Sequence, residues 1–218
     1  MGTESGQEFR FYTKLDQTIL LGRKASNVPG LLEGIKTVPE SSIYYHTHKF
    51  LQQHHYLSPE PPNDFAYWIT NVLNEPTLGE QLSSIDIIQF HTIEDLRKTF
   101  VDTIESFLQT ANRTVESPAG EQFYFMGSQT FVFRTSHVAR TLPEFVECLN
   151  RVTIHSLYLH VFDSRLRLEH EENDFSVWFR KIGHGKLADA VKKLDPYTQT
   201  LDGLRRNIIQ LAKRYAED

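Results

Sequence analysis

The chain has 218 residues and a formal net charge of −5, and 39% of its residues are hydrophobic, which excludes an intrinsically disordered chain. No apolar run approaches the roughly 20 residues that a membrane-spanning helix needs, so we expect no membrane partner. The polar N-terminus has no signal-peptide core, and a single cysteine, Cys148, excludes an internal disulfide framework, which together predict a location in the reducing cytoplasm.

The charge is divided unevenly along the chain. Residues 1–118 carry 9 Lys or Arg against 15 Asp or Glu, whereas residues 119–218 carry 14 against 13. Neither half contains the clustered basic stripe that a phosphate backbone requires, so a nucleic-acid partner is not expected.

Two runs of aromatic and β-branched residues predict β-hairpins. After a disordered tail over residues 1–8, the runs 9–12 and 18–21 flank the polar stretch 14–17, and the runs 123–125 and 130–133 flank Gly127-Ser128-Gln129. Because a lone two-stranded hairpin is marginally stable, we expect the two hairpins to share one small antiparallel sheet.

About five helices are predicted after each hairpin. The first of each set has a proline near its first turn, and Ser42 and Ser156 are plausible N-caps of the second. Thr92 has the spacing of a capping-box residue at the start of the last helix of the first set. The predicted helices cover residues 28–36, 42–57, a segment starting at Asn63, 77–85 and 92–109, and then 142–151, 156–169, a segment starting at Asn173, 186–194 and 200–216.

The two halves of the chain also share short motifs. Ile43-Tyr44-Tyr45-His46 recurs as Leu157-Tyr158-Leu159-His160, and Asn63-Asp64-Phe65 recurs as Asn173-Asp174-Phe175. We therefore predict a helix-dominated α+β fold of two tandem copies, residues 9–111 and 121–218, joined by a linker at 112–120 and packed as one pseudo-twofold body.

Residues present in both copies are expected to serve the fold first. Asn63 and Asp64 suit a helix N-cap, although the aspartate could instead be a metal ligand or a general base. His46 suits a clamp that donates to a carboxylate of the next helix, although the same pair could position a ligand. The full set of paired positions is Tyr44, His46, Asn63, Asp64, Trp68 and Arg97, matched by Tyr158, His160, Asn173, Asp174, Trp178 and Arg205.

The tryptophans and arginines of this set have their own alternatives. Trp68 and Trp178 are expected to fill the core rather than to stack on a ligand. Arg97 and Arg205 begin a helix, at the unfavourable positive end of its dipole, so we expect them to pair with Asp86 and Asp195. The alternative is an anion site between the copies that both arginines line.

A few residues occur in the first copy alone. His48, His54, His55 and Tyr56 are therefore the predicted binding residues, on a segment that extends to Pro62. His46, His48, His54 and Asp64 could hold a divalent metal, but they lack the His-x3-His spacing that helical zinc sites use. No other cofactor is predicted, because no phosphate loop or Cys-x-x-Cys sequence occurs.

The motifs also resemble a known family. The runs Ile-Tyr-Tyr-His-Thr-His at 43–48, Pro-Pro-Asn-Asp-Phe-Ala-Tyr-Trp at 61–68 and Leu-Gly-Glu-Gln-Leu at 78–82 are similar to those of an uncharacterised prokaryotic family known as a domain of unknown function. The resemblance covers nearly the whole chain, and it implies no activity, substrate or cofactor.

The sequence thus predicts a non-enzymatic protein that binds an unknown protein or small molecule between its two copies. The alternative is a metal-dependent hydrolase with a His/Asp site in the first copy. A third possibility is assembly through an exposed edge of the shared sheet.

Overall fold

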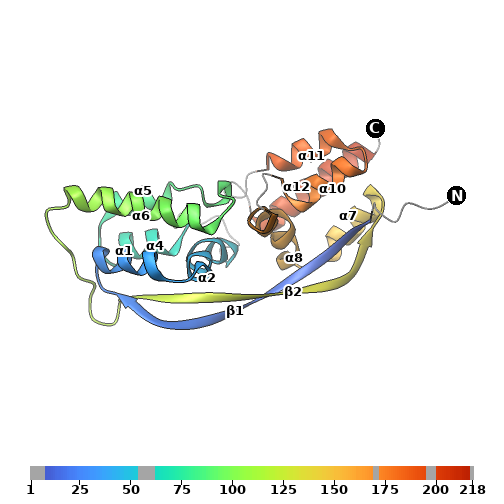
Figure 1. Cartoon of the computed structure of the whole chain (residues 1–218). Helices are drawn as coiled ribbons and strands as arrows, with labels where there is room; N and C mark the ends of the chain where they lie inside the picture. The colour runs from blue at the N-terminus through green and yellow to red at the C-terminus, as the bar shows by residue number, and fades with distance from the viewer. Residues whose placement is uncertain (1–7, 54–61, 169–171, 195–199, 217–218) are drawn as a thin grey trace. The chain divides into compact units, whose positions relative to one another are not determined.

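The computed structural model describes residues 8–53, 62–168, 172–194 and 200–216, and in these ranges the fold is helix-dominated α+β with one two-stranded antiparallel sheet (Figure 1). The strands are β1 (Phe9–Ala25) and β2 (Phe123–Ala139), and they pair with each other. No helix in the described ranges is long and apolar enough to cross a membrane.

The described chain divides into two compact units. The N-unit comprises residues 16–53 and 62–129, and the C-unit comprises residues 8–15 together with the described residues from 130 onwards. Each unit therefore contains one part of β1 and one part of β2, so the units do not follow the predicted copies. The pseudo-twofold packing of those copies stays a prediction.

The two predicted hairpins are wrong, because each pair of apolar runs forms one continuous strand of 17 residues. A two-residue hairpin turn requires positive φ angles. Among the described residues, only Asn74, Gly22, Gly120 and Gly183 have them, and none lies in the polar stretches 14–17 and 127–129. The backbone therefore stays extended through both stretches, and β1 pairs with β2 rather than with itself.

The helices of the N-unit follow the predicted order. They are α1 (Val28–Thr37), α2 (Glu40–Tyr44), the π-helix η1 (Tyr45–Lys49), α3 (Phe50–Gln53), α4 (Asp64–Asn71), α5 (Pro76–Ser83), the 3-10 helix η2 (Ile87–Gln89) and α6 (Ile93–Thr110). The core of this unit takes Phe123 and Phe125 from β2, and a Cβ added to Gly34 of α1 would lie 2.0 Å from the Phe125 ring. Glycine at this position lets α1 pack directly on the strand.

The C-unit has matching elements. They are α7 (Leu142–Arg151), α8 (Ile154–Tyr158), the π-helix η3 (Leu159–Asp163), α9 (Ser164–Leu168), α10 (Asp174–Lys181), α11 (Gly185–Lys192) and α12 (Leu201–Ala216). Phe9 and Phe11 of β1 are buried here among the rings of Phe145, Phe175 and Trp178. The core of the C-unit is therefore completed by the first residues of the described chain.

Two of the predicted helix starts need correction. Ser42 and Ser156 lie inside α2 and α8, whose N-caps are Pro39 and Thr153. The hydroxyl of Thr153 accepts from the Ser156 N–H at 3.2 Å, so the cap lies three residues earlier than predicted.

The other predicted caps are confirmed. The Asn63 side chain accepts from the N–H of Ala66 at 2.9 Å, and the Asn173 side chain accepts from that of Ser176 at 2.8 Å. Thr92 likewise caps α6 through the N–H of Asp95. These side chains satisfy backbone donors that a helix start leaves without a partner.

Candidate functional site

The His46 imidazole joins three elements of the N-unit. It lies on η1 with 1% of its surface exposed, its Nδ1 is 2.6 Å from Oδ2 of Asp64 on α4, and its Nε2 accepts the backbone N–H of Met126 on β2 at 2.9 Å. Because Nε2 accepts a hydrogen bond, the proton must be on Nδ1, which donates to the carboxylate. Both ring nitrogens are therefore engaged inside the fold.

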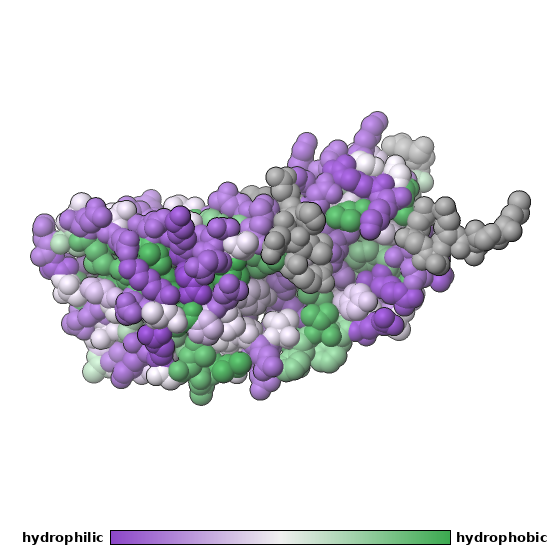
Figure 2. Space-filling model, viewed as in Figure 1, coloured by the Kyte–Doolittle hydropathy of each residue, from purple (hydrophilic) through white to green (hydrophobic). Residues whose placement is uncertain are grey.

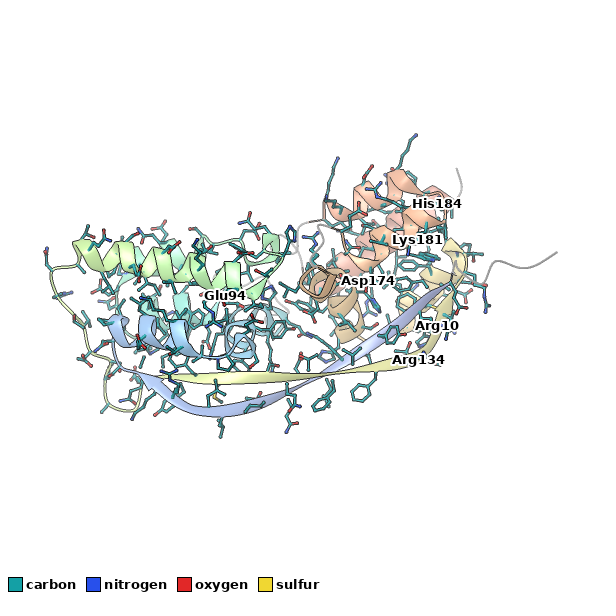
Figure 3. All side chains as sticks on the ribbon, viewed as in Figure 1. Arg10, Glu94, Arg134, Asp174, Lys181 and His184 are labelled. Carbon is teal, nitrogen blue, oxygen red and sulfur yellow. The ribbon has the colours of Figure 1, made fainter. Side chains whose placement is uncertain are left out.

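His160 makes the same contacts in the C-unit. Its Nδ1 lies 2.7 Å from Oδ2 of Asp174, which Figure 3 labels at the start of α10, and its Nε2 accepts the backbone N–H of Tyr12 on β1 at 2.9 Å. Ser156 adds a hydrogen bond from its hydroxyl to the Tyr12 carbonyl at 2.6 Å. The outward-facing backbone groups of this strand residue are thus bonded to helix side chains in place of a third strand.

Each of these histidines is the second residue of a π-helix. A π turn contains one more residue than an α turn, so it changes which side chains face a neighbouring element. Side-chain hydroxyls bond the carbonyls of both segments, from Thr47 to Ile43 at 2.6 Å and from Ser164 to His160 at 2.8 Å. Sequence periodicity indicated a regular helix here, and the structure places a wider turn at both histidines.

The predicted metal and binding residues are only partly brought together. His48 is buried, its ring stacks on Tyr44 at a centroid distance of 5.5 Å, and its Nδ1 is 3.1 Å from the Thr47 hydroxyl. No group of three or more His, Cys, Asp or Glu side chains with a metal-like arrangement occurs in the described part of the chain. The predicted residues His54, His55 and Tyr56 lie outside it.

The tryptophans fill the cores, as expected. Trp68 is 5% exposed, packs against Phe123, and its indole N–H donates to the carbonyl of Glu121 at 2.8 Å. Trp178 is 4% exposed and stacks on Phe145.

The arginine partners differ from the prediction. Arg97 of α6 donates to the carbonyl oxygens of Ile35 and Val38, at 2.5 and 2.8 Å, and to the Glu94 carboxylate at 2.8 Å. Asp86 instead caps η2 through the N–H of Ile88. The guanidinium thus lies at the C-terminus of α1, where the helix dipole is negative and the last carbonyls lack partners.

Arg205 of α12 makes the corresponding contacts in the C-unit. It donates to the carbonyls of Leu149 and Val152, at 3.4 and 2.9 Å, at the C-terminus of α7. Its predicted partner Asp195 lies outside the described residues.

Two buried lysines were missed by sequence reasoning, which treats lysine as a surface residue. The Lys14 side chain is fully buried in the C-unit, where it pairs with Asp163 of η3 at 2.6 Å and lies 4.8 Å from the centre of the Tyr158 ring. In the N-unit Lys49 of η1 donates to the Thr18 hydroxyl of β1 at 2.9 Å. Each lysine thus links a π-helix to a strand.

An exposed apolar surface on the strands was also missed. Of the large hydrophobic residues that are exposed in the described chain, all but Tyr67 lie on β1 or β2. We call three of the C-unit members the ribbon patch: Leu15 (61% exposed), Phe131 (39%) and Phe133 (49%). Val132 is also exposed, but it points to the opposite face of β2, because successive side chains of a strand alternate between faces. Figure 2 shows hydrophobic side chains reaching the surface along the strands.

The ribbon patch had a signal in the sequence. Residues 128–133 contain no charge, and Arg134 follows them directly (Figure 3). An uncharged run of high β propensity, followed at once by a charged residue, is typical of a strand that is not fully covered.

A cleft in the C-unit is lined by an arginine that is already bonded to two carboxylates. Arg140 is paired with Glu8, and its backbone N–H donates to the Glu144 carboxylate at 2.6 Å. The cleft, of 340 Å³, lies where α7 and α11 begin and is lined by Arg140, Thr141, Leu142, Pro143, Ile182, His184 and Ala216. The two carboxylates beside Arg140 make it a poor site for an anion.

Comparison with known proteins places these contacts in a family without an assigned activity. The chain is similar to OrfY from Thermoproteus tenax, a solved structure, with a TM-score of 0.81, 26% sequence identity and 99% of each chain covered. No curated protein matches it. The family of unknown function DUF5752 matches residues 6–213. The chain, with its paired histidine and arginine contacts, therefore belongs to the family of unknown function DUF5752.

Proposed function

We propose that the protein acts by binding another protein rather than by catalysing a reaction, and that the ribbon patch is its contact surface. The observation that carries the proposal is the exposure of two phenylalanines on one face of β2 and of a leucine on the adjacent strand β1. Contiguous exposed apolar surface on a folded protein is typical of an interaction site, because burying it in a complex is favourable.

The hydrogen bonds of the polar motif residues support this proposal, because they engage these side chains inside the fold. His46, His160, Arg97 and Arg205 all bond within their own units. A general base must reach a substrate proton, and a metal ligand needs an open lone pair. The imidazole nitrogens are occupied by the carboxylate and by the strand N–H, so these contacts suit a scaffold.

A metal-dependent hydrolase built on His46, His48, His54 and Asp64 remains the second candidate. It is favoured only by the 2.6 Å contact between His46 and Asp64, an arrangement that also orients histidine ligands around metals. Stoichiometric zinc, manganese or iron in protein purified without a histidine tag would support this candidate. We place no ligand site between the predicted copies.

The matching contacts of the two units support a further proposal about origin. In each unit a π-helical histidine joins an aspartate to a strand N–H, and an arginine caps the end of the first helix. We propose that the chain arose by duplication of one segment.

Site-specific photocrosslinking in the native host tests the proposed function. A benzophenone amino acid is placed at Phe131 or Phe133 in the full-length protein, and at the exposed Asp102 of α6 as a control. We expect a discrete crosslinked product from the two patch positions and none from Asp102. The proposal is wrong if the patch positions give no discrete product, or if Asp102 gives the same one.

A further inference from the structure

We infer that each unit contains a binding site for an extended strand start, and that one buried charge in each site decides which of the two starts binds there. The starts are residues 9–14 of β1 and 123–128 of β2. The deciding charge is that of Asp163 in the C-unit and that of Lys49 in the N-unit. These sites lie in the cores of the units and are independent of the ribbon patch.

Each start lies against helices from the other half of the sequence. Residues 9–14 belong to the C-unit, whose helices begin at Leu142, and residues 123–128 belong to the N-unit, whose helices end at Thr110. We call this the crossed arrangement. In the alternative, the hairpin arrangement, each start would turn back onto the rest of its own strand and bind to the helices that follow that strand.

Most contacts of a start are the same in the two units. Phe9 packs on His160 at a centroid distance of 5.0 Å, and Phe123 packs on His46 at 4.6 Å. Each phenylalanine ring also lies 5.7 Å from the tryptophan of its unit. Three residues further along each start, the strand N–H donates to the imidazole at 2.9 Å. Aromatic packing and backbone hydrogen bonds of this kind fit either start, so they do not distinguish the two.

The buried residue five positions after each phenylalanine differs between the starts. In the C-unit it is Lys14, whose fully buried side chain pairs with Asp163 at 2.6 Å. In the N-unit it is Ser128, which is 7% exposed and whose Oγ has no hydrogen-bond partner among the described residues. The helix residue three positions after the histidine differs as well, because Asp163 of the C-unit corresponds to the buried Lys49 of the N-unit.

The Lys49 ammonium lies beside Ser128. It donates to the Thr18 hydroxyl of β1 at 2.9 Å. A Cβ added to Gly127 would lie 3.8 Å from that of Ile19, so these two residues are opposite each other in the antiparallel pair, and Thr18 is opposite Ser128. Opposite side chains lie on the same face of a sheet, with their Cβ atoms about 5 Å apart. A lysine in place of Ser128 would therefore bring a second ammonium close to that of Lys49.

The hairpin arrangement would create two unfavourable contacts. Lys14 would bind in the N-unit, where its ammonium would meet that of Lys49. Ser128 would bind in the C-unit, where Asp163 would lose the ammonium of Lys14. Bringing like charges together in a buried site and removing one partner of a buried ion pair are both strongly destabilising. The charges thus favour the crossed arrangement by attraction in the C-unit and by repulsion in the N-unit.

Ser128→Lys in the full-length protein tests the repulsion. The unfolding equilibrium constant of the N-unit, followed by Trp68 fluorescence during urea unfolding in a Trp178→Phe background, should rise by roughly tenfold or more. Adding Lys49→Asp should reverse most of this loss, because the N-unit then contains the same Lys–Asp pair as the C-unit. Ser128→Met is the control for size, since methionine is long but uncharged, and Lys49→Asp should not rescue it.

The double variant Lys49→Asp/Asp163→Lys tests the choice between the two arrangements. It keeps the composition and net charge of the chain, but the favourable charge for Lys14 is now in the N-unit. We therefore expect the variant to shift from the crossed to the hairpin arrangement.

Nuclear Overhauser contacts of the Tyr12 amide proton distinguish the two arrangements. In the crossed arrangement this N–H donates to His160, so a contact with a ring proton of His160 is expected in the unmodified protein. In the hairpin arrangement Tyr12 takes the place of Met126, and the contact is with His46 instead. The double variant should gain the His46 contact and lose most of the His160 contact.

Three results would overturn the inference. The first is a folded double variant that keeps the full His160 contact and gains none with His46. The second is a Ser128→Lys variant that Lys49→Asp does not rescue, and the third is an equal rescue of Ser128→Met. If the double variant does not fold, the rescue of Ser128→Lys decides alone.

Discussion

At the scale of single residues, each buried histidine uses its two ring nitrogens to bond an aspartate at a helix start and a strand N–H. His160 must be neutral at Nε2 to accept the Tyr12 N–H, and Asp174 holds the proton on Nδ1. One side chain thus fixes a helix start and a strand to a π-helix.

Replacing His160 by phenylalanine should loosen one strand position and leave the equivalent one intact. The Tyr12 N–H and the Asp174 carboxylate lose their partner, which costs about 1–3 kcal/mol. Hydrogen exchange should therefore become faster at the Tyr12 amide while the Met126 amide, bonded to His46, stays protected. His46→Phe should give the reverse pattern, and equal acceleration at both amides in either variant would contradict independent connectors.

Cys148 should react slowly with thiol reagents at neutral pH. Burial, together with the Glu144 charge, raises the pKa of this thiol above its ordinary value of 9.0. The reactive thiolate is therefore scarcer at pH 7 than in an exposed cysteine, and the rate should still be rising above pH 9. Reaction with Ellman's reagent across pH, compared with the urea-unfolded chain, measures the shift. A native rate that levels off below pH 9 would contradict it.

At the scale of elements, the close approach of α1 to β2 depends on a missing side chain. A Cβ at Gly34 would lie 2.0 Å from Cζ and 2.3 Å from Cε2 of Phe125, whose ring is buried in the core of the N-unit. Neither the helix nor the ring can shift without disturbing that core.

Gly34→Ala should therefore destabilise the N-unit although alanine is the better helix former. Overpacking of this kind costs about 1–3 kcal/mol, more than the propensity gain. Gly185→Ala is the matched control, because the new Cβ would meet nothing closer than 3.8 Å. This variant should raise the free energy of unfolding by about 0.4–1 kcal/mol. Urea unfolding followed by circular dichroism measures both, and a neutral Gly34→Ala would contradict the packing described.

At the scale of the whole molecule, each unit depends on strand residues that lie far away in the sequence. Phe11 is buried in the C-unit beside Phe145, and Phe125 is buried in the N-unit beside Phe123. The start of β1 therefore completes the core of the C-unit, and the start of β2 completes the core of the N-unit.

Removal of one ring should accordingly destabilise the unit that holds it. Phe11→Ala should cost the C-unit about 3–5 kcal/mol, and Phe125→Ala should cost the N-unit a similar amount. Trp68 reports on the N-unit and Trp178 on the C-unit, so fluorescence in Trp178→Phe and Trp68→Phe backgrounds follows each unit separately. If Phe11→Ala lowered only the Trp68 transition, the assignment of strand halves to units would be wrong.

The sequence by itself determined most helices and several of their caps, because local signals such as Asn63 before a helix act over three residues. It also identified the two tryptophans as core residues and singled out the histidines that connect helix to strand. These features depend on side-chain type and short spacing, which a sequence displays directly.

Only the tertiary structure decided how the strands pair and what each arginine binds. Two apolar runs separated by polar residues fit a hairpin or one long strand equally well, and the choice depends on partners more than 100 residues away. Arg97 could have met Asp86, but the carbonyls at the end of α1 come within reach only once α1 and α6 have packed. The exposure of the ribbon patch could not be predicted for the same reason. The sequence shows that Phe131 and Phe133 are apolar, but it does not show which strand residues the helices leave uncovered.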